Sequence, residues 1–163
     1  MLNPDQLLGV AKLLASPPAK GAPVQAKLRR AISTAYYALF HTLVAAASDL
    51  LVGGKSRGTQ RYLAVYRSFE HKRMADVCRQ VSNGKLLTDA GVAFHATIQE
   101  CANAFVDLQE NRHEADYDPA GRMTLADARA AVSRANDAIQ MLQASPDGER
   151  FLFLTLLHFK LRS

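Results

Sequence analysis

The stretch LRRAISTAYYALFHTLVAAASDLL, residues 28–51, decides the fold of this 163-residue chain. It contains neither Pro nor Gly and is rich in Ala and Leu, which are the strongest helix formers. At 3.6 residues per turn, one apolar face comprises Ile32, Tyr36, Leu39, Leu43 and Leu50. Most of the remaining circumference is also apolar, through Tyr37, Phe40, Val44 and Leu51. Because a helix that is apolar nearly all round is normally buried inside a bundle, we expect the other helices to pack around this one.

Three polar side chains interrupt this apolar helix, namely Tyr36, Tyr37 and His41. A phenol or an imidazole in such surroundings needs hydrogen-bond partners, either from another helix or from a second subunit. Residue type alone favours a structural role, with two core tyrosines and one hydrogen-bonded histidine. A role in a binding or catalytic site is the alternative.

Helix signals elsewhere divide the chain at Pro and Gly residues. The predicted helices cover about residues 4–15, 23–52, 59–81, 88–116 and 123–143. Asn3 can cap the first of them, and Thr124 with Asp127 can form a capping box for the last.

The C-terminal stretch FLFLTLLHFKL, residues 151–161, is apolar on every side, so periodicity does not distinguish a helix from a strand. Since no other strand is predicted, we expect a helix that packs on the bundle or is shared between subunits. The predicted fold is therefore all-α: an up-down antiparallel bundle of about five helices plus a C-terminal helical segment. One domain is expected over residues 1–163, with its core at 23–143 and an apolar extension at 144–163.

The composition is that of a soluble globular domain, with 48% hydrophobic and 21% charged residues. A net charge of +5 permits a nucleic-acid partner without requiring one. Cys78 and Cys101 form no CxxC pair, which predicts reduced, buried thiols. The N-terminus lacks the basic segment of a signal peptide, and no apolar run approaches the roughly 20 residues that span a bilayer. These features predict a cytoplasmic protein without a membrane partner.

Local motifs for cofactors and metals are missing from the sequence. The five histidines show no metal-ligand spacing, and there is no phosphate-binding Walker loop, dinucleotide fingerprint or nucleophile elbow. We therefore expect neither a metal nor a cofactor.

Arg112 stands out because it continues an apolar stripe formed by Phe94, Ile98, Cys101, Phe105 and Leu108. Burying a guanidinium costs several kcal/mol unless carboxylates or other acceptors receive its donors. Asp116, one turn later, is the nearest candidate partner, and Asp118 is a second. Such an arginine is either half of a structural ion pair or held ready for an anion.

A second basic group lies in RSFEHKRM, residues 67–74, where Arg67, His71, Lys72 and Arg73 come close together. A solvated basic face is the favoured interpretation. Binding of nucleic acid by His71 and Arg73 is the alternative.

Two segments, RAISTAYYALFH at 30–41 and NRHEADYDP at 111–119, together resemble the HEPN superfamily. These are small α-helical bundle proteins of prokaryotes, often encoded beside a minimal nucleotidyltransferase. The closest motif is Arg-x-x-Ala-Asp-Tyr, which here is Arg112 to Tyr117. The resemblance covers about residues 23–143. It implies an antiparallel core of four to five helices, commonly a homodimer whose late-helix arginines face a shared groove.

Catalytic HEPN proteins are metal-independent endoribonucleases, and many act as toxins or in phage defence. Their motif is an arginine followed, after four to six intervening residues, by a histidine. Here Tyr117, Asp118 and Pro119 occupy those positions after Arg112, and no other arginine meets the spacing. His113 is adjacent to Arg112 and lies about 100° round the helix from it.

Three functions follow from these residues. The first is a homodimeric module of a toxin–antitoxin or defence system that binds RNA or a nucleotide. In it Arg112 contacts the anion, Asp116 orients Arg112, and Tyr117 and Tyr37 stack or donate. The further candidate binding residues are Tyr36, His71 and Arg73.

The second function is that of a divergent ribonuclease in which Arg112 stabilises the transition state and His113 or His41 transfers protons. The third is an interaction protein in which Arg112 and Asp116 form a structural ion pair. A minimal nucleotidyltransferase is a possible protein partner.

Overall fold

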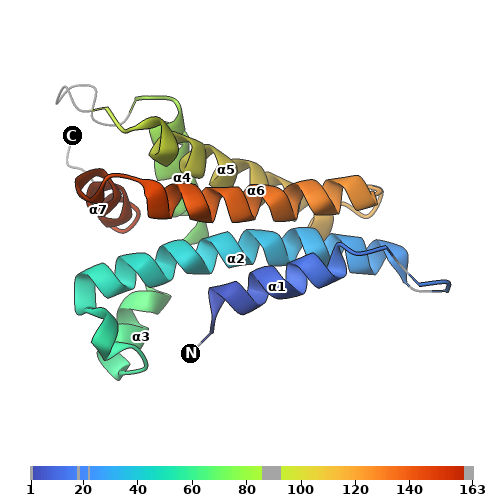
Figure 1. Ribbon diagram of the computed structural model, residues 1–163, viewed down its shortest axis with the longest axis horizontal. Helices are drawn as coiled ribbons and strands as arrows, with labels where there is room; N and C mark the ends of the chain where they lie inside the picture. The colour runs from blue at the N-terminus through green and yellow to red at the C-terminus, as the bar shows by residue number, and fades with distance from the viewer. Residues whose placement is uncertain (1, 18, 22, 86–92, 160–163) are drawn as a thin grey trace.

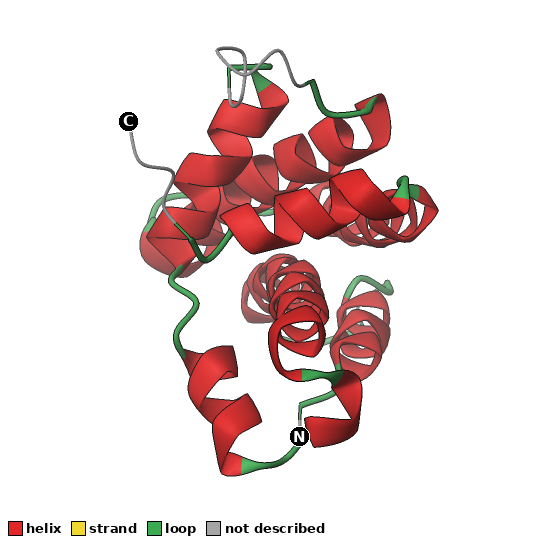
Figure 2. Cartoon of the chain, turned by 90° about the vertical axis from the view of Figure 1, so that its left-hand side faces the viewer, coloured by secondary structure: helices red, strands yellow, loops and turns green. Residues whose placement is uncertain are grey.

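Only helices and loops occur in the part of the chain that the computed structural model describes, residues 2–17, 19–21, 23–85 and 93–159 (Figure 1 and Figure 2). The elements in chain order are α1 (Pro4–Leu14), α2 (Val24–Val52), the 3-10 helix η1 (Gly54–Ser56), α3 (Gln60–Arg67), α4 (His71–Ser82), α5 (Ala96–Tyr117), α6 (Leu125–Ala144) and α7 (Asp147–Leu156). The predicted all-α class is confirmed.

The long apolar stretch forms α2, and the other helices pack around it as expected. α1 runs along one side of α2 and α6 along another, while α5 also packs against α2 (Figure 1). Residues from nearly every side of α2 are buried. Its last turn differs from the prediction, because Leu50 and Leu51 are 37% and 38% exposed. Near that end α2 is contacted by η1 and α3, two short elements.

The predicted helix 59–81 is instead two helices, α3 and α4, separated by residues 68–70. α3 packs on α2, where the buried Tyr62 hydroxyl donates to Asp49 Oδ1 over 2.8 Å, whereas α4 packs on α5. A single straight helix over residues 59–81 would not pack on α2 with one half and on α5 with the other. At the bend, Ser68 Oγ donates to the Val65 carbonyl over 2.6 Å, a local bond that competes with helix continuation.

Two other helix boundaries also differ from the prediction. α5 begins at Ala96 with His95 as its N-cap, and residues 93–95 are not helical; the rest of the predicted start, residues 88–92, lies outside the described residues. α7 begins at Asp147, four residues before the apolar run. It folds back onto this chain and buries Phe153, Leu154 and Leu156.

The local signals for caps and thiols are confirmed. Asn3 caps α1, and Thr124 with Asp127 forms the capping box of α6. Cys78 and Cys101 are buried free thiols, and burial raises the pKa of Cys101 to about 12.

α2 is also long and apolar enough to cross a membrane by length and composition alone. The expectation that no run approaches that length is therefore wrong for this helix. Of its most apolar 18-residue window, 56% is buried inside the protein. A buried core helix of a soluble protein meets the same criterion of length and composition.

Candidate functional site

The C-terminal end of α5 is held against α2 by Arg29. Its Nη1 donates to the carbonyls of Ala115 and Asp118, each over 2.8 Å, and its Nη2 donates to the carbonyl of Gly121. The last carbonyls of a helix have no partner within the helix. Arg29 supplies donors to this end and to the loop that follows, so it positions the segment that carries the candidate site.

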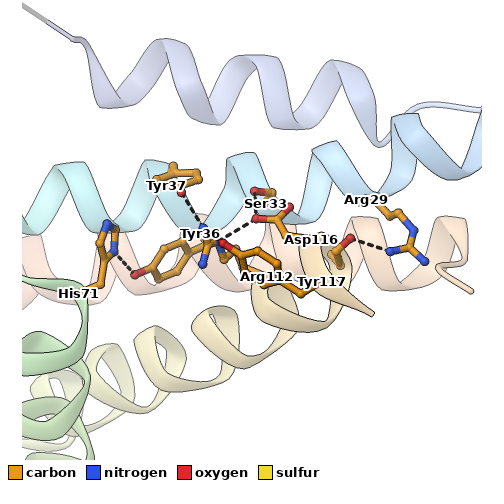
Figure 3. Close-up of polar contacts among 9 residues, drawn as sticks. Arg29, Ser33, Tyr36, Tyr37, His71, Arg112, Asp116 and Tyr117 are labelled. Carbon is orange, nitrogen blue, oxygen red and sulfur yellow. Dashed lines mark hydrogen bonds and ion pairs between the residues drawn. The ribbon is translucent and has the colours of Figure 1, made fainter. Parts of the chain in front are cut away.

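Arg112 lies at the centre of a polar cluster between α5 and α2 (Figure 3). Its Nε is 2.8 Å from Asp116 Oδ2, as a charge pair without an aligned hydrogen bond. Its Nη2 donates to the hydroxyls of Tyr37 and Tyr117 over 3.0 and 3.4 Å. Ser33 Oγ in turn donates to Asp116 Oδ2 over 3.2 Å. The predicted pairing of Arg112 with Asp116 is confirmed.

The Arg112 guanidinium lies at the edge of the core and not inside it. The side chains of Arg112 and Asp116 are 23% and 25% exposed. Nη1 of Arg112 makes no hydrogen bond with any described residue, and it is not among the enclosed polar atoms. One nitrogen of a firmly held guanidinium is therefore open to solvent. The other predicted partner, Asp118, instead accepts from the backbone N–H of Ala120 over 2.8 Å.

Two histidine–tyrosine pairs lie along the same side of α2. His71 Nδ1 is 2.6 Å from the Tyr36 hydroxyl, and the His71 ring stacks on Phe40 with centroids 3.9 Å apart. His41 Nδ1 is 2.8 Å from the Tyr66 hydroxyl. Both hydroxyls therefore hold the imidazoles in fixed orientations.

The Tyr37 ring joins the two histidines to Arg112. Its centroid is 6.1 Å from that of His41 and 6.0 Å from that of His71, and the Arg112 Cζ lies 5.6 Å from it. Of the predicted site residues, the structure thus brings together Tyr37, Arg112, His41, His71 and, on the outer side, Asp116 and Tyr117.

Three predicted residues have a different place. Tyr36 is 1% exposed, so it can orient His71 but cannot touch a ligand directly. Arg73 Nε donates to the His158 carbonyl over 2.9 Å, which ties α4 to the residues that follow α7. Among the described residues, no hydrogen bond or ion pair joins Arg73 to the Arg112 cluster. His113 is exposed, and its ring lies 4.9 Å from that of Tyr117.

A groove of 520 Å³ runs beside Arg112. Its lining residues are Arg79, Gln109, Glu110, Arg112, His113, Glu114 and Asp118. Arg79 is paired with Asp76 at 3.1 Å. The exposed carboxylates of Glu110 and Glu114 make neither a hydrogen bond nor an ion pair with any described residue.

Sequence reasoning missed Ser33, Arg29 and most of this groove. Ser33 carries a usable signal in the sequence, because it is a polar residue one turn before Tyr37 on an apolar helix. In the structure its side chain is 0% exposed. Arg29 carries none, since its acceptors are carbonyls 86 to 92 residues further along the chain. Within the described residues, no three His, Cys, Asp or Glu side chains are grouped so that they could hold a metal ion.

Stability is expected to depend on pH through His41 and His71. Burial is the main cause that lowers the pKa of each in the folded protein; His71 lowers that of His41 further, and Arg112 that of His71. The unfolded chain then binds protons more readily, so stability is full above the unfolded pKa of about 6.5 and falls as the pH drops below it. We expect the melting temperature to fall between about pH 7 and pH 5.5. A His41→Asn, His71→Asn double variant should show a flatter slope, and a wild-type curve that is already flat over this range would contradict the prediction.

Comparison with known proteins adds no relative. No family model, no curated protein and no solved structure matches this chain. Segments 30–41 and 111–119 are in contact through two hydrogen bonds, from Arg112 to Tyr37 and from Ser33 to Asp116.

Proposed function

We propose that this protein is a HEPN-like helical-bundle protein that binds single-stranded RNA through Arg112. The proposal rests on how the Arg112 guanidinium is held and on which of its donors is unused. Asp116 and two tyrosine hydroxyls hold it in place, while Nη1 has no partner among the described residues. A pre-oriented arginine with free donors is well suited to a phosphate, because its planar fork matches phosphate oxygens.

The aromatic surroundings of Arg112 favour single strands over duplexes. Tyr117 is 61% exposed, and its ring centroid lies 5.2 Å from Arg112 Cζ. His113 extends this aromatic surface. Stacking on exposed rings needs unpaired bases, since the bases of a duplex are already stacked.

The test is the affinity of the protein for a fluorescently labelled single-stranded RNA and for the same sequence as a duplex. We expect the single strand to bind more tightly. Tyr117→Ala should weaken binding by about 5-fold to 100-fold, because a stacked base contributes about 1–3 kcal/mol. Phe151→Ala is the matched control, since Phe151 is an exposed aromatic residue on α7 (55% exposed). Equal losses in both variants, or a preference for the duplex, would count against the proposal.

A second candidate is metal-independent RNA cleavage, favoured by the two histidines near Tyr37. The ring centroids of His41 and His71 lie 6.1 and 6.0 Å from that of Tyr37, and both histidines have a lowered pKa. A neutral imidazole can take the proton of a ribose 2′-hydroxyl, and the second histidine, in its protonated imidazolium form, can give a proton to the leaving 5′-oxygen. Arg112 would stabilise the charge on the phosphate. In this arrangement His71, and not His113, is the partner of His41.

The cleavage candidate is tested by incubating RNA with the protein in EDTA. Cleavage by wild type that is lost in His71→Ala, while RNA binding persists, would establish it. Intact RNA in the presence of bound wild-type protein would leave binding as the function.

The remaining proposals concern assembly. The HEPN resemblance implies an up-down antiparallel bundle that forms a cytoplasmic homodimer, with a minimal nucleotidyltransferase as its partner in a toxin–antitoxin or defence system. Light scattering measures the oligomeric state directly, and a monomer at micromolar concentration would exclude the homodimer.

A further inference from the structure

The groove beside Arg112 carries three kinds of group in order around α5. At about 100° per residue, His113 follows Arg112 by about 100°, Tyr117 by about 140° and Glu110 by about 160°. Glu114 lies next to Glu110, one turn along the helix. Arg112, His113, Glu110 and Glu114 line the groove, and the Tyr117 ring lies beside His113. The groove therefore carries a cation, an aromatic surface and a pair of carboxylates.

The two glutamates are the free acceptors of this groove. Neither Glu110 nor Glu114 has a hydrogen-bond or ion-pair partner among the described residues, whereas Asp118 is occupied by Ala120 N–H and Arg79 by Asp76. Unpaired carboxylates repel the phosphates of RNA. In an RNA site they are useful only where the ligand offers donors, and the donors of RNA other than the ribose hydroxyls are on the bases.

We infer that the groove selects guanine, an inference that rests on the proposed binding of single-stranded RNA at Arg112. Guanine places two N–H donors, N1 and N2, side by side on its Watson–Crick edge, and one carboxylate accepts both. Adenine and cytosine present one donor beside an acceptor, and uracil presents one donor between two acceptors. These acceptors face a carboxylate with lone pairs and repel it.

The position of each group follows from the groove. The phosphate contacts Arg112 Nη1, the base stacks on His113, which lines the groove, and on the adjacent ring of Tyr117, and its edge meets Glu110 or Glu114. The volume of 520 Å³ is in the usual range of about 300–1,000 Å³ for small-molecule sites.

The experiment compares five octamers: uridine octamer and four variants in which one central uridine is replaced by guanosine, inosine, adenosine or cytidine. We expect the guanosine octamer to bind roughly tenfold or more tightly than the others. Inosine lacks the N2 amino group, so it should lose most of the gain. A Glu110→Gln, Glu114→Gln double variant should lose the preference. Glu100→Gln, an exposed glutamate on the same helix, should retain it.

The outcomes separate this inference from the proposed function. Equal binding of all five octamers by the wild type would overturn guanine selection and leave RNA binding standing. Failure of every octamer to bind would overturn both. Because the ligand series uses wild-type protein, its result does not depend on how well the variants fold.

Discussion

Arg112→Ala should weaken binding of single-stranded RNA by about 10-fold to 100-fold. A hydrogen bond to a charged group contributes about 1.5–3 kcal/mol, and Arg112 supplies the free donor of the site. Arg112→Lys should restore only part of the affinity, because an ammonium keeps the charge but not the planar fork. Fluorescence anisotropy with a labelled octamer measures the change. Arg61→Ala is the control, since it removes the same charge from an exposed position on α3; we expect its affinity within about twofold of wild type.

The melting temperature of Arg112→Ala distinguishes a ligand-binding arginine from a structural one. Arg112 and Asp116 are an i, i+4 pair, each about a quarter exposed, and such pairs contribute about 0.3–0.5 kcal/mol. Asp116 also keeps its bond from Ser33 in the variant. The variant also loses the hydrogen bonds from Arg112 to the hydroxyls of Tyr37 and Tyr117, but both lie at the edge of the core, where water can replace the lost donor. We therefore expect a loss of about 1 kcal/mol, smaller than that of Arg29→Ala. Several kcal/mol lost with RNA affinity unchanged would support the third hypothesis, a structural ion pair in an interaction protein.

The parts of the fold and site that could be predicted are those that depend on neighbours in sequence. α2 was predictable because its apolar surface is continuous and unbroken by Pro or Gly. The Arg112–Asp116 pair was predictable because residues four apart face each other on a helix. The capping box of α6 is local for the same reason.

The rest depends on contacts between distant segments. The break between α3 and α4 arises because one packs on α2 and the other on α5, which no local pattern records. His71 belongs to the site because α4 brings it to Phe40 and Tyr36, whereas in sequence it belongs to a basic run of surface type. The Glu110 carboxylate has no partner among the described residues, which likewise depends on the residues that distant segments place around it in the groove.

Arg29→Ala should have the largest effect on stability among the polar substitutions considered, about 2 kcal/mol or more. Arg29 donates three hydrogen bonds to carbonyls at the end of α5 and in the following loop. Each bond from a charged donor contributes about 1.5–3 kcal/mol when its acceptor is shielded, and less where water can replace it. In a protein of this size the melting temperature should fall by about 4–8 °C.

Arg30→Ala is the matched control for Arg29→Ala, because Arg30 is the next residue on α2, is exposed, and has no partner among the described residues. We expect its stability within about 0.5 kcal/mol of wild type. Arg29→Ala should also weaken RNA binding at temperatures where the protein remains folded, because Arg112 and Tyr117 lie in the last two turns of α5, whose end Arg29 holds. Arg29→Lys should recover little of either property, since a single ammonium does not reach the three carbonyls that the guanidinium bridges.

Equal melting temperatures for the Arg29 and Arg30 variants would show that the end of α5 is held by its packing alone. Reduced stability with unchanged RNA affinity would show instead that the position of Arg112 depends on Asp116 and Tyr37, without help from the helix end.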